Sequence, residues 1–551
     1  MNTEDYTPQF EKRVYGEAVR ITGQIPMDKP CFVISCNRGE IANDTLRAAK
    51  ENMHPAVFTA AIHTTGDRQY GYVNQSEFKM CIGPDSFSAE ERAKGRANTP
   101  YMDIPILFTA FDNIRKEATR MFGEDGFQIG VHPGYGMLSE DPEFVKNCID
   151  EGYIFIGPGL KTQEAMGPKD SARDLAVKAG LQVVPGAGDI KTLKDAQKAH
   201  KDIIKANPEL KDRRFRLKAV AGGGGRGQIV FQGVDDLPEK FEAVQIICKN
   251  LGWPSHFVME LNIEVSRHYE IQMFRDLTFF GRECTLMRNH QKEIEEFLSP
   301  ETLKKDDPVA AAQLQKMIDA APMLAKECAL DSVATLECIY DEQSEKLYFL
   351  EMNTRIQVEH PVSNAATGVD LLRAQILHAF GAPMILKQEE IGSMGHSIEA
   401  RITNLDPYDK NFGPLGGNKI DRYWRPERTD RIRHYGYLTS GNTVTSFDPM
   451  FAKIIGRGHD RQEAIEALFR GLSEFIIDGP SFRHNIPHQL FVISHPKFIE
   501  HDYNSETMDL IRTDFLEKFV PFFDSNYGKE NRYNNPIVAD AVNDYYGHHF
   551  H

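Results

Sequence analysis

The feature that most constrains the fold of this chain is a run of glycines, Gly222-Gly223-Gly224-Gly225-Arg226-Gly227. It contains the spacing G-x-G-x-x-G of dinucleotide-binding folds, which need a strand before the glycines and a helix after them. A strand pattern precedes the run at 215–220, but the β-branched and aromatic segment 228–232 that follows it predicts a second strand. The run therefore closes a β-hairpin, and it is no P-loop because no Gly-Lys-Ser/Thr ends it. Backbone N–H groups at such a tip can approach phosphates, and the tip can move as a lid; a flexible surface turn is the alternative.

Strand and helix patterns divide the chain into regions of different type. Residues 31–155 alternate strands with helices, which predicts an open α/β sheet with crossover helices. Residues 156–390 and 391–500 mix strands and helices as α+β regions do. We expect an N-terminal arm at 1–30, whereas the aromatic extension 501–551 carries no structural prediction. The hairpin-like strand pairs expected in the second region are 215–220 with 228–232, 256–264 with 268–274, and 333–340 with 346–352.

Composition and charge exclude several classes of protein. The 551 residues include 64 Lys and Arg against 80 Asp and Glu, and the net charge of −16 argues against a general binder of nucleic acids or membrane surfaces. No apolar run reaches the ~18 residues of a membrane span, and the polar start is no secretory peptide, so we predict a soluble, cytoplasmic protein. The eight cysteines form no C-x-x-C pair and are expected to be reduced, packed thiols rather than zinc ligands or disulfides.

Two lysines flank the glycine-tipped hairpin in positions that suit an anion. Lys218 lies four residues before the first glycine, on the entering strand, and Lys169 follows a turn and precedes a helical stretch. A single lysine is more often a solvated charge, and that interpretation stays open for both. Beside a glycine lid, the two ammonium groups indicate an anion clamp.

A second dense motif continues from the apolar strand 347–350. Glu351 and Asn353 are two apart, so both side chains leave one face of an extended strand, and Glu337 lies on the strand predicted to pair with it. Two carboxylates and an amide oxygen form an all-oxygen set that suits Mg²⁺ bound together with substrate phosphates. An ion-paired edge strand is the alternative.

The same segment continues with Arg355, Gln357 and Glu359, which keep the spacing of two along a predicted extended run. Arginine offers a fork for a planar oxyanion, and a nearby carboxylate can act as a general base. His290-Gln291-Lys292 adds a further cationic donor, which alone would mean little.

In these motifs the chain closely resembles the biotin carboxylases, the ATP-grasp components of biotin-dependent carboxylases. The matching segments occur in order over about residues 31–495, and the segment from Glu351 to Pro361 is highly specific. Besides it and the glycine run they are Asn37-Arg38-Gly39-Glu40-Ile41-Ala42, His132-Pro133-Gly134-Tyr135-Gly136, Phe155-Ile156-Gly157-Pro158, Met166-Gly167-Pro168-Lys169, Arg267-His268-Tyr269-Glu270-Ile271-Gln272, His290-Gln291-Lys292 and Gly395-His396-Ser397-Ile398-Glu399-Ala400-Arg401.

The resemblance implies an α/β and α+β multidomain fold and a nucleotide site. The domains would be a Rossmann-like pre-ATP-grasp domain at 31–155, an ATP-grasp domain at 156–390 with a mobile glycine-rich lid at about 173–240, and a biotin carboxylase C-terminal α+β domain at 391–500. The groups that would bind ATP are Lys169, Lys218, the glycine loop, the hinge from Glu260 to Ile263, His268 and His290. Mg²⁺ or Mn²⁺ would be held by Glu337, Glu351 and Asn353.

The resemblance also implies a reaction, the ATP-dependent carboxylation of biotin. The groups that would bind bicarbonate are Lys292, Arg355, Gln357 and the backbone of Val358. Glu359 would deprotonate bicarbonate, which would attack the γ-phosphate of ATP to give carboxyphosphate. This intermediate would yield CO₂ and phosphate, and the phosphate would take the proton from biotin N1′. Arg401 would stabilise the enolate-like oxygen of biotin, with Tyr135 nearby.

Departures from the family pattern leave other functions open. Leu261 stands where the family usually has lysine, and Leu286-Met287-Arg288-Asn289 lacks a usual glutamine and arginine, which puts the affinity for ATP in doubt. A non-catalytic nucleotide-binding subunit of a carboxylase is therefore one alternative. Another ATP-grasp ligase, joining a carboxylate to an amine, is the second.

Partners are predicted from what the sequence does not contain. It has no Ala/Val-Met-Lys-Met, the biotin-attachment signature, so biotin is expected on a separate carrier protein that also serves a carboxyltransferase subunit. A homodimer is expected from the resemblance alone. The acyl acceptor of the complete carboxylase stays open.

Overall fold

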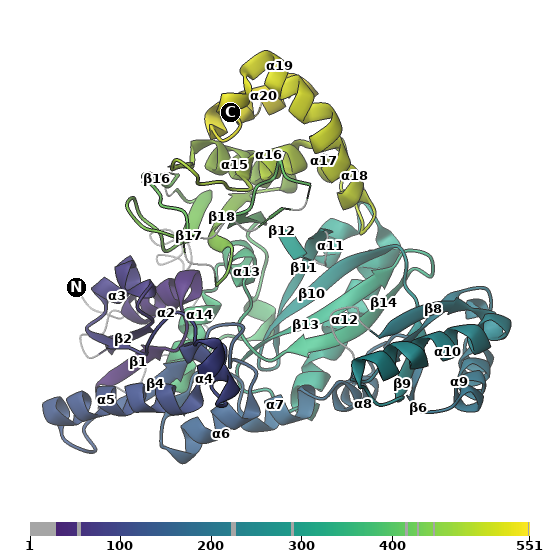
Figure 1. The fold of residues 1–551 in the computed structure, drawn as a ribbon, viewed down its shortest axis with the longest axis horizontal. Coiled ribbons are helices and arrows are strands. Elements are labelled where there is room, and N and C mark those ends of the chain that lie inside the picture. The colour runs from purple at the N-terminus through teal and green to yellow at the C-terminus, as the bar shows by residue number, and fades with distance from the viewer. Residues whose placement is uncertain are drawn as a thin grey trace.

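Figure 1 shows the fold of the computed structural model, which describes residues 29–51, 57–221, 227–287, 291–410, 412–413, 417–426, 429–444, 447–548 and 550. For residues 286, 287 and 291 it describes the backbone only. The expected N-terminal arm up to residue 28, the glycines at 222–225 and His290 lie outside these ranges, so their roles stay predictions. None of the helices described there has both the length and the apolar character that a bilayer crossing requires.

The first domain contains a five-stranded parallel sheet in the order β3-β2-β1-β4-β5. Central β1 is buried throughout: Val33 packs with Ile41 of helix α2 on one face, and Phe32 packs with Leu107 of helix α5 on the other. The open α/β sheet predicted from the sequence is confirmed. The sequence missed β3, a half-exposed edge strand of four residues. The elements are β1 (Cys31–Ser35), α2 (Gly39–Glu51), β2 (Val57–His63), β3 (Phe78–Cys81), α5 (Ile104–Phe122), β4 (Gln128–His132), α6 (Pro142–Asp150) and β5 (Ile154–Phe155).

The centre of the molecule is an antiparallel sheet of eight strands in the order β14-β13-β10-β11-β12-β15-β18-β17. Its first five strands come from the second region of the chain and its last three from the third region. The junction is the pairing of β12 with β15, in which Ile294 lies opposite Ala400. The strands are β10 (Ser266–Phe274), β11 (Leu277–Met287), β12 (Gln291–Leu298), β13 (Val333–Asp341), β14 (Lys346–Asn353), β15 (His396–Thr403), β17 (Ile432–Gly436) and β18 (Met450–Gly458).

One of the three predicted hairpins is wrong. The pairs at 215–220 with 228–232 and at 333–340 with 346–352 form as β7–β8 and β13–β14. Strand β9 (Phe257–Leu261), however, pairs with β6 and β7, while β10 pairs with β11 and β13. All nine residues of β10 are buried, because it is an inner strand of the large sheet that needs two partners, and its sequence neighbour belongs to another sheet.

The lid of the predicted ATP-grasp domain is a separate four-stranded sheet in the order β6-β9-β7-β8, covered by helices α9 and α10. Figure 1 shows it projecting from one end of the molecule. Gly227, the last glycine of the hairpin loop, has a φ of +71°, a conformation that favours glycine. The elements are β6 (Gly186–Ile190), α9 (Leu193–Ala206), β7 (Arg214–Ala219), β8 (Gln228–Gln232) and α10 (Gly233–Leu251).

The extension that the sequence left without a prediction is helical. It contains helices α18 (Thr507–Asp514), α19 (Val520–Tyr527) and α20 (Asn535–Tyr546); α20 packs on α15 (Arg461–Glu474) and α16 (Ile486–Ser494), and α19 packs on α20 (Figure 1). Phe515 and Phe519, on the π-helical turn Phe515–Phe519 that joins α18 to α19, and Phe523 of α19 are fully buried. Their spacing of four places them on one helical face, a signal that the sequence did contain.

Candidate functional site

A cavity of about 390 Å³ lies against the large sheet and collects predicted site residues from four strands (β12, β13, β14 and β15) and the loop after β14. Nine of them line it: Lys292, Glu337, Glu351, Asn353, Arg355, Gln357, Val358, Glu359 and Arg401. Asp448 and Pro449, just before β18, close another part of the wall. The sequence motifs that were predicted to act together therefore share one space.

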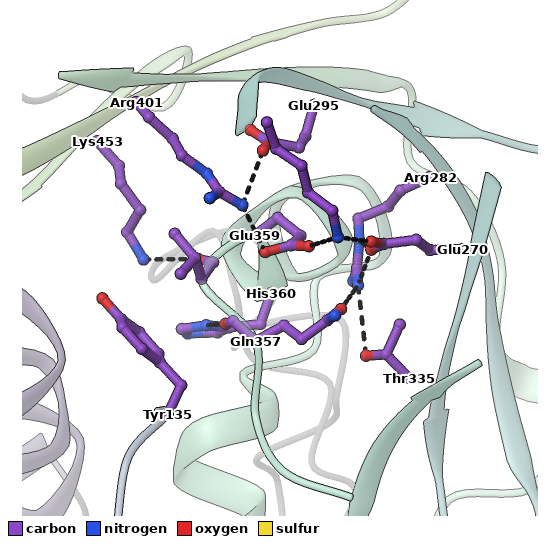
Figure 2. A network of polar contacts seen from close by, with 12 residues as sticks. Tyr135, Glu270, Arg282, Glu295, Thr335, Gln357, Glu359, His360, Arg401 and Lys453 are labelled. Carbon is purple, nitrogen blue, oxygen red and sulfur yellow. Dashed lines mark hydrogen bonds and ion pairs between the residues drawn. The ribbon is translucent and has the colours of Figure 1, made fainter. Parts of the chain in front are cut away.

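Glu359 is at the centre of this cluster (Figure 2). Its Oε1 accepts a hydrogen bond from Lys292 Nζ at 2.9 Å, and its Oε2 accepts one from Arg401 Nη2, also at 2.9 Å. Burial and the nearby Glu270 oppose its charge, but Lys292, Arg401 and Arg282 outweigh them and hold the pKa of Glu359 below its usual value. The side chain is therefore a buried carboxylate that stays ionised and can accept a proton.

The predicted extended run from Glu351 to Glu359 is wrong in its second half. Strand β14 ends at Asn353, the following residues form a loop, and Glu359 directly precedes helix α13 (His360–Thr367). Proline at 361, in the first helical turn, favours a helix start there. The loop lets Gln357 and Glu359 face the same cluster without a regular spacing of two.

Lys292 joins three carboxylates. Its Nζ contacts Glu270, Glu337 Oε1 at 3.1 Å and Glu359 Oε1 at 2.9 Å. Burial lowers the pKa of Lys292, but the three acids reverse this and raise it well above the ordinary value. The ammonium group is thus fixed in its charged form beside the cavity.

Sequence reasoning missed the layer behind these residues, which is centred on Arg282 of β11. This arginine is fully buried, and its Nη2 donates to Glu270 Oε2 at 2.8 Å and to Gln357 Oε1 at 2.9 Å. Gln357 Nε2 in turn donates to Glu337 Oε1 at 2.8 Å. An arginine after the largely apolar residues 277–281 was the available signal that this position is unusual, although it did not identify its partners.

Arg355 lies at the edge of the cluster. Its Nε donates to Glu140 Oε2 at 2.9 Å and its Nη2 to Asn353 Oδ1 at 3.0 Å. Glu140, just before α6, also accepts from the backbone N–H of Thr354 at 2.9 Å. The first domain therefore holds the start of the loop that carries Gln357 and Glu359.

The three predicted metal ligands lie together on β13 and β14. Glu337 and Glu351 are direct cross-strand partners, and Asn353 Nδ2 donates to Glu337 Oε1 at 2.8 Å. Glu351 is exposed at the mouth of the cavity and has no hydrogen-bond or ion-pair partner within the described residues; partial desolvation and the charge of Glu337 raise its pKa. Two carboxylates side by side, one of them unpartnered, fit an oxygen-bound divalent cation.

The groups predicted to bind ATP are more open. Lys218 forms an ion pair with Glu260, and their side chains are 39% and 27% exposed. Lys169 is exposed at the start of α8 (Lys169–Lys178), and Ile263 is half-buried. His268 lies deeper, with Nε2 3.3 Å from Glu270 Oε1 and 3.5 Å from Glu337 Oε2, so it belongs to the carboxylate cluster.

The predicted biotin residues approach the cluster from the other side. Arg401 Nη2 lies 2.9 Å from Glu359 Oε2 and 2.8 Å from Glu295 Oε1. The hydroxyl of Tyr135 donates to Glu40 Oε2 at 2.6 Å. Figure 2 shows Arg401, Glu359 and Tyr135 around one side of the site.

Known protein families match this chain over most of its length. Three family models match: "Biotin carboxylase, N-terminal domain" at residues 31–163, "Carbamoyl-phosphate synthase L chain, ATP binding domain" at 168–387, and "Biotin carboxylase C-terminal domain" at 399–510. Biotin carboxylase 1 of Bacillus subtilis is 32% identical over 488 residues, which cover 87% of this chain and 98% of that protein. The mitochondrial propionyl-CoA carboxylase alpha chain of Mus musculus is 32% identical over 500 residues, 89% of this chain but 61% of that protein.

Solved structures of biotin carboxylases have a similar fold. A biotin carboxylase complex with β,γ-ATP from Campylobacter jejuni superposes with a TM-score of 0.71 at 29% identity, covering 87% of this chain and 98% of that one. The biotin carboxylase domain dimer of the Hydrogenobacter thermophilus 2-oxoglutarate carboxylase, in complex with MgADP, ADP and bicarbonate, has a TM-score of 0.69 at 28% identity, with the same coverage.

Proposed function

The chain belongs to the biotin carboxylase family, and we propose that it uses ATP and bicarbonate to carboxylate biotin through the groups described above. The observation that carries this proposal is Glu359, a buried carboxylate held at 2.9 Å by both Lys292 and Arg401 on the wall of the cavity. A base that stays ionised next to two cations can deprotonate an anion that those cations attract.

Bicarbonate is proposed to bind against Lys292, Gln357 and the backbone of Val358, with Arg355 at the edge. Its hydroxyl proton passes to Glu359, and the oxygen forms a bond to the γ-phosphorus of ATP while the bond to ADP breaks. The carboxyphosphate formed splits into CO₂ and phosphate. The phosphate accepts the N1′ proton of biotin, and N1′ forms the new C–N bond with CO₂.

Arg401 is proposed to change partners during this sequence. Before proton transfer it pairs with ionised Glu359. Once Glu359 has taken up the proton, the attraction falls, and the guanidinium can stabilise the negative oxygen of deprotonated biotin. Tyr135 is proposed to lie against the bound biotin.

Glu337, Glu351 and Asn353 are proposed to hold Mg²⁺ or Mn²⁺, and the unpartnered carboxylate of Glu351 supports this assignment. When bound, the ion neutralises phosphate charge. The groups proposed to bind ATP are Lys169, Lys218, Gly222 to Gly225 with Gly227, Glu260, Ile263, His268 and His290. The separate sheet of the lid supports its closure over the phosphates, which would exclude water from carboxyphosphate.

Members of this family work as subunits or domains of biotin-dependent carboxylases, with a carrier and a carboxyltransferase. We propose that biotin reaches this chain on a separate carrier protein, and that the chain forms a homodimer, as in the dimer structure of the Hydrogenobacter domain. The eight free cysteines, seven of them buried, fit a cytoplasmic location. The relatives act in carboxylases named for different acceptors, propionyl-CoA and 2-oxoglutarate, so the acceptor is not assigned.

The test is bicarbonate-dependent ATP hydrolysis by the purified chain, with and without free biotin. We expect turnover that biotin stimulates and that Glu359→Gln lowers by at least about a hundredfold. ATP binding without turnover would contradict the proposal and favour the non-catalytic nucleotide-binding subunit. Turnover stimulated by an amine rather than by biotin would favour the other kind of ATP-grasp ligase.

A further inference from the structure

The backbone around Val358 is fixed by side chains that the reaction itself does not use. Val358 lies between Gln357 and Glu359 and lines the cavity. Its N–H has no acceptor within the described residues, so it is available to a ligand. This N–H shares one planar trans peptide group with the Gln357 carbonyl and points away from that oxygen, while the next peptide group, with the Val358 carbonyl, fixes the other side of the residue.

Each of these carbonyls accepts a hydrogen bond from a buried side chain (Figure 2). His360 Nδ1 lies 2.8 Å from the Gln357 oxygen, and because a carbonyl only accepts, Nδ1 carries the hydrogen. Lys453 Nζ donates to the Val358 oxygen at 2.7 Å. His360 and Lys453 are both 0% exposed.

Both donors face carboxylates of the same helix of the first domain, at ion-pair distance and not as hydrogen bonds in the case of His360. His360 Nε2 lies 3.3 Å from Asp44 Oδ2, and Lys453 Nζ lies 2.7 Å from Glu40 Oε1. Glu40 and Asp44 are one turn apart on α2, and both are buried. Despite burial, Glu40 and other nearby acids raise the pKa of Lys453, so this interior lysine stays charged.

We propose that Glu40 and Asp44 are positioning residues for bicarbonate, which act through Lys453 and His360 to hold the two peptide groups around Val358 and keep its N–H available to the anion. This inference rests on the proposed function. Helix α2 would thus contribute to bicarbonate binding without contacting the bicarbonate. Because the hydroxyl of Tyr135 donates to Glu40 Oε2, a residue proposed to lie against biotin contacts the same carboxylate that pairs with Lys453.

The test measures KM for bicarbonate and for ATP in bicarbonate-dependent ATP hydrolysis by the full chain. Lys453→Met and His360→Leu are expected to raise KM for bicarbonate by about tenfold, the effect of losing one charge-assisted hydrogen bond, with KM for ATP unchanged. Glu40→Gln and Asp44→Asn are expected to raise it in the same direction by less, because an amide keeps part of each contact.

Two polar variants of His360 separate positioning from stability. An asparagine amide can replace Nδ1–H as the donor to the Gln357 oxygen, whereas a glutamine amide reaches toward Asp44 instead. We therefore expect His360→Asn to keep KM for bicarbonate close to that of the wild type and His360→Gln to raise it. The matched control is His396→Leu, which removes another buried histidine, 3.1 Å from Glu296 Oε2 and outside the loop, and should leave KM for bicarbonate unchanged.

Three results would overturn the inference: an unchanged KM for bicarbonate in Lys453→Met and in both polar His360 variants, a parallel rise of both KM values, or an equal effect of His396→Leu. Wild-type protein without bicarbonate-dependent turnover would contradict the proposed function instead. Wild-type turnover combined with unaffected variants would contradict only the positioning role.

Discussion

The residues proposed to bind bicarbonate and those proposed to bind the nucleotide are held in different ways. On the proposed bicarbonate side Lys292 lies on β12, Arg401 lies on the neighbouring strand β15, and Glu359 directly precedes helix α13. The charged groups of these three residues are already paired, with Glu359 between the two cations. On the proposed nucleotide side Lys218 and Glu260 are partly exposed on the lid sheet, and among the residues that the structure describes their ion pair is only with each other. Preorganised charges stabilise a reacting anion without rearrangement, whereas a nucleotide that must enter and leave needs groups that can move.

This difference predicts which substitutions stop chemistry and which weaken binding. Glu359→Gln keeps the shape of the side chain but removes the base. The rate of bicarbonate-dependent ATP hydrolysis should fall by about 10²–10⁴-fold, the usual contribution of general base catalysis. Initial rates at saturating substrate measure this. Retained turnover would show that the bicarbonate side does not supply the proton acceptor assigned to it.

Lys292→Met should have the largest effect on stability. It leaves Glu270, Glu337 and Glu359 facing one another without their shared cation, and removing one partner of a buried ion pair costs about 3–5 kcal/mol. Urea denaturation compares the free energy of unfolding with that of the wild type. A loss no greater than that of a surface lysine would remove the contrast between the two sides.

Measurements of stability at several pH values test the protonation of Glu295, whose carboxyl group lies 2.8 Å from Arg401 Nη2. Burial raises the pKa of Glu295 to about 7, and Glu359 adds to this, while Arg401 opposes it. The folded state thus keeps a proton that the unfolded chain releases near pH 4.5, so this group makes the protein less stable as pH rises from about 4.5 to 7. Glu295→Gln should remove that slope and gain on the order of 1–3 kcal/mol above pH 7. Urea denaturation at several pH values measures it, and parallel curves for both proteins would contradict the assignment.

The smallest effect is expected on the nucleotide side. Lys218→Met removes an exposed ion pair, so the free energy of unfolding should change by less than ~1 kcal/mol. If Lys218 binds phosphate, KM for ATP should rise by about tenfold while KM for bicarbonate stays the same. Loss of stability comparable to that of Lys292→Met would show that the two sides are not built differently.

The parts of the site that the sequence predicted are those that local geometry determines. Glu351 and Asn353 are two apart on a strand, and Glu337 faces them across a short hairpin, so spacing alone brought them together. The same reasoning failed beyond Asn353, because the chain leaves the strand and enters α13. It also failed for the hairpin at 256–264 with 268–274, since strand patterns do not specify a partner.

What the sequence could not show depends on contacts between distant segments. Arg282, Glu40 and Asp44 carry no local signal for their partners, which lie up to several hundred residues away. Leu261 is a different case: its side chain is 2% exposed and packs in the lid core, whereas the next residue back, Glu260, meets Lys218. Its departure from the family pattern therefore alters the interior of the lid.

The pairing of β12 with β15 has a consequence for a chain cut in two. A break between α14 (Leu371–Ala379) and β15 would leave one fragment ending its sheet at β12 and another beginning its sheet at β15. Each would expose a row of unpaired N–H and C=O groups whose natural partner is the other, with Ile294 and Ala400 setting the register. The fragments should therefore recombine when mixed, and because Lys292 and Arg401 lie on opposite halves, activity would report their reunion.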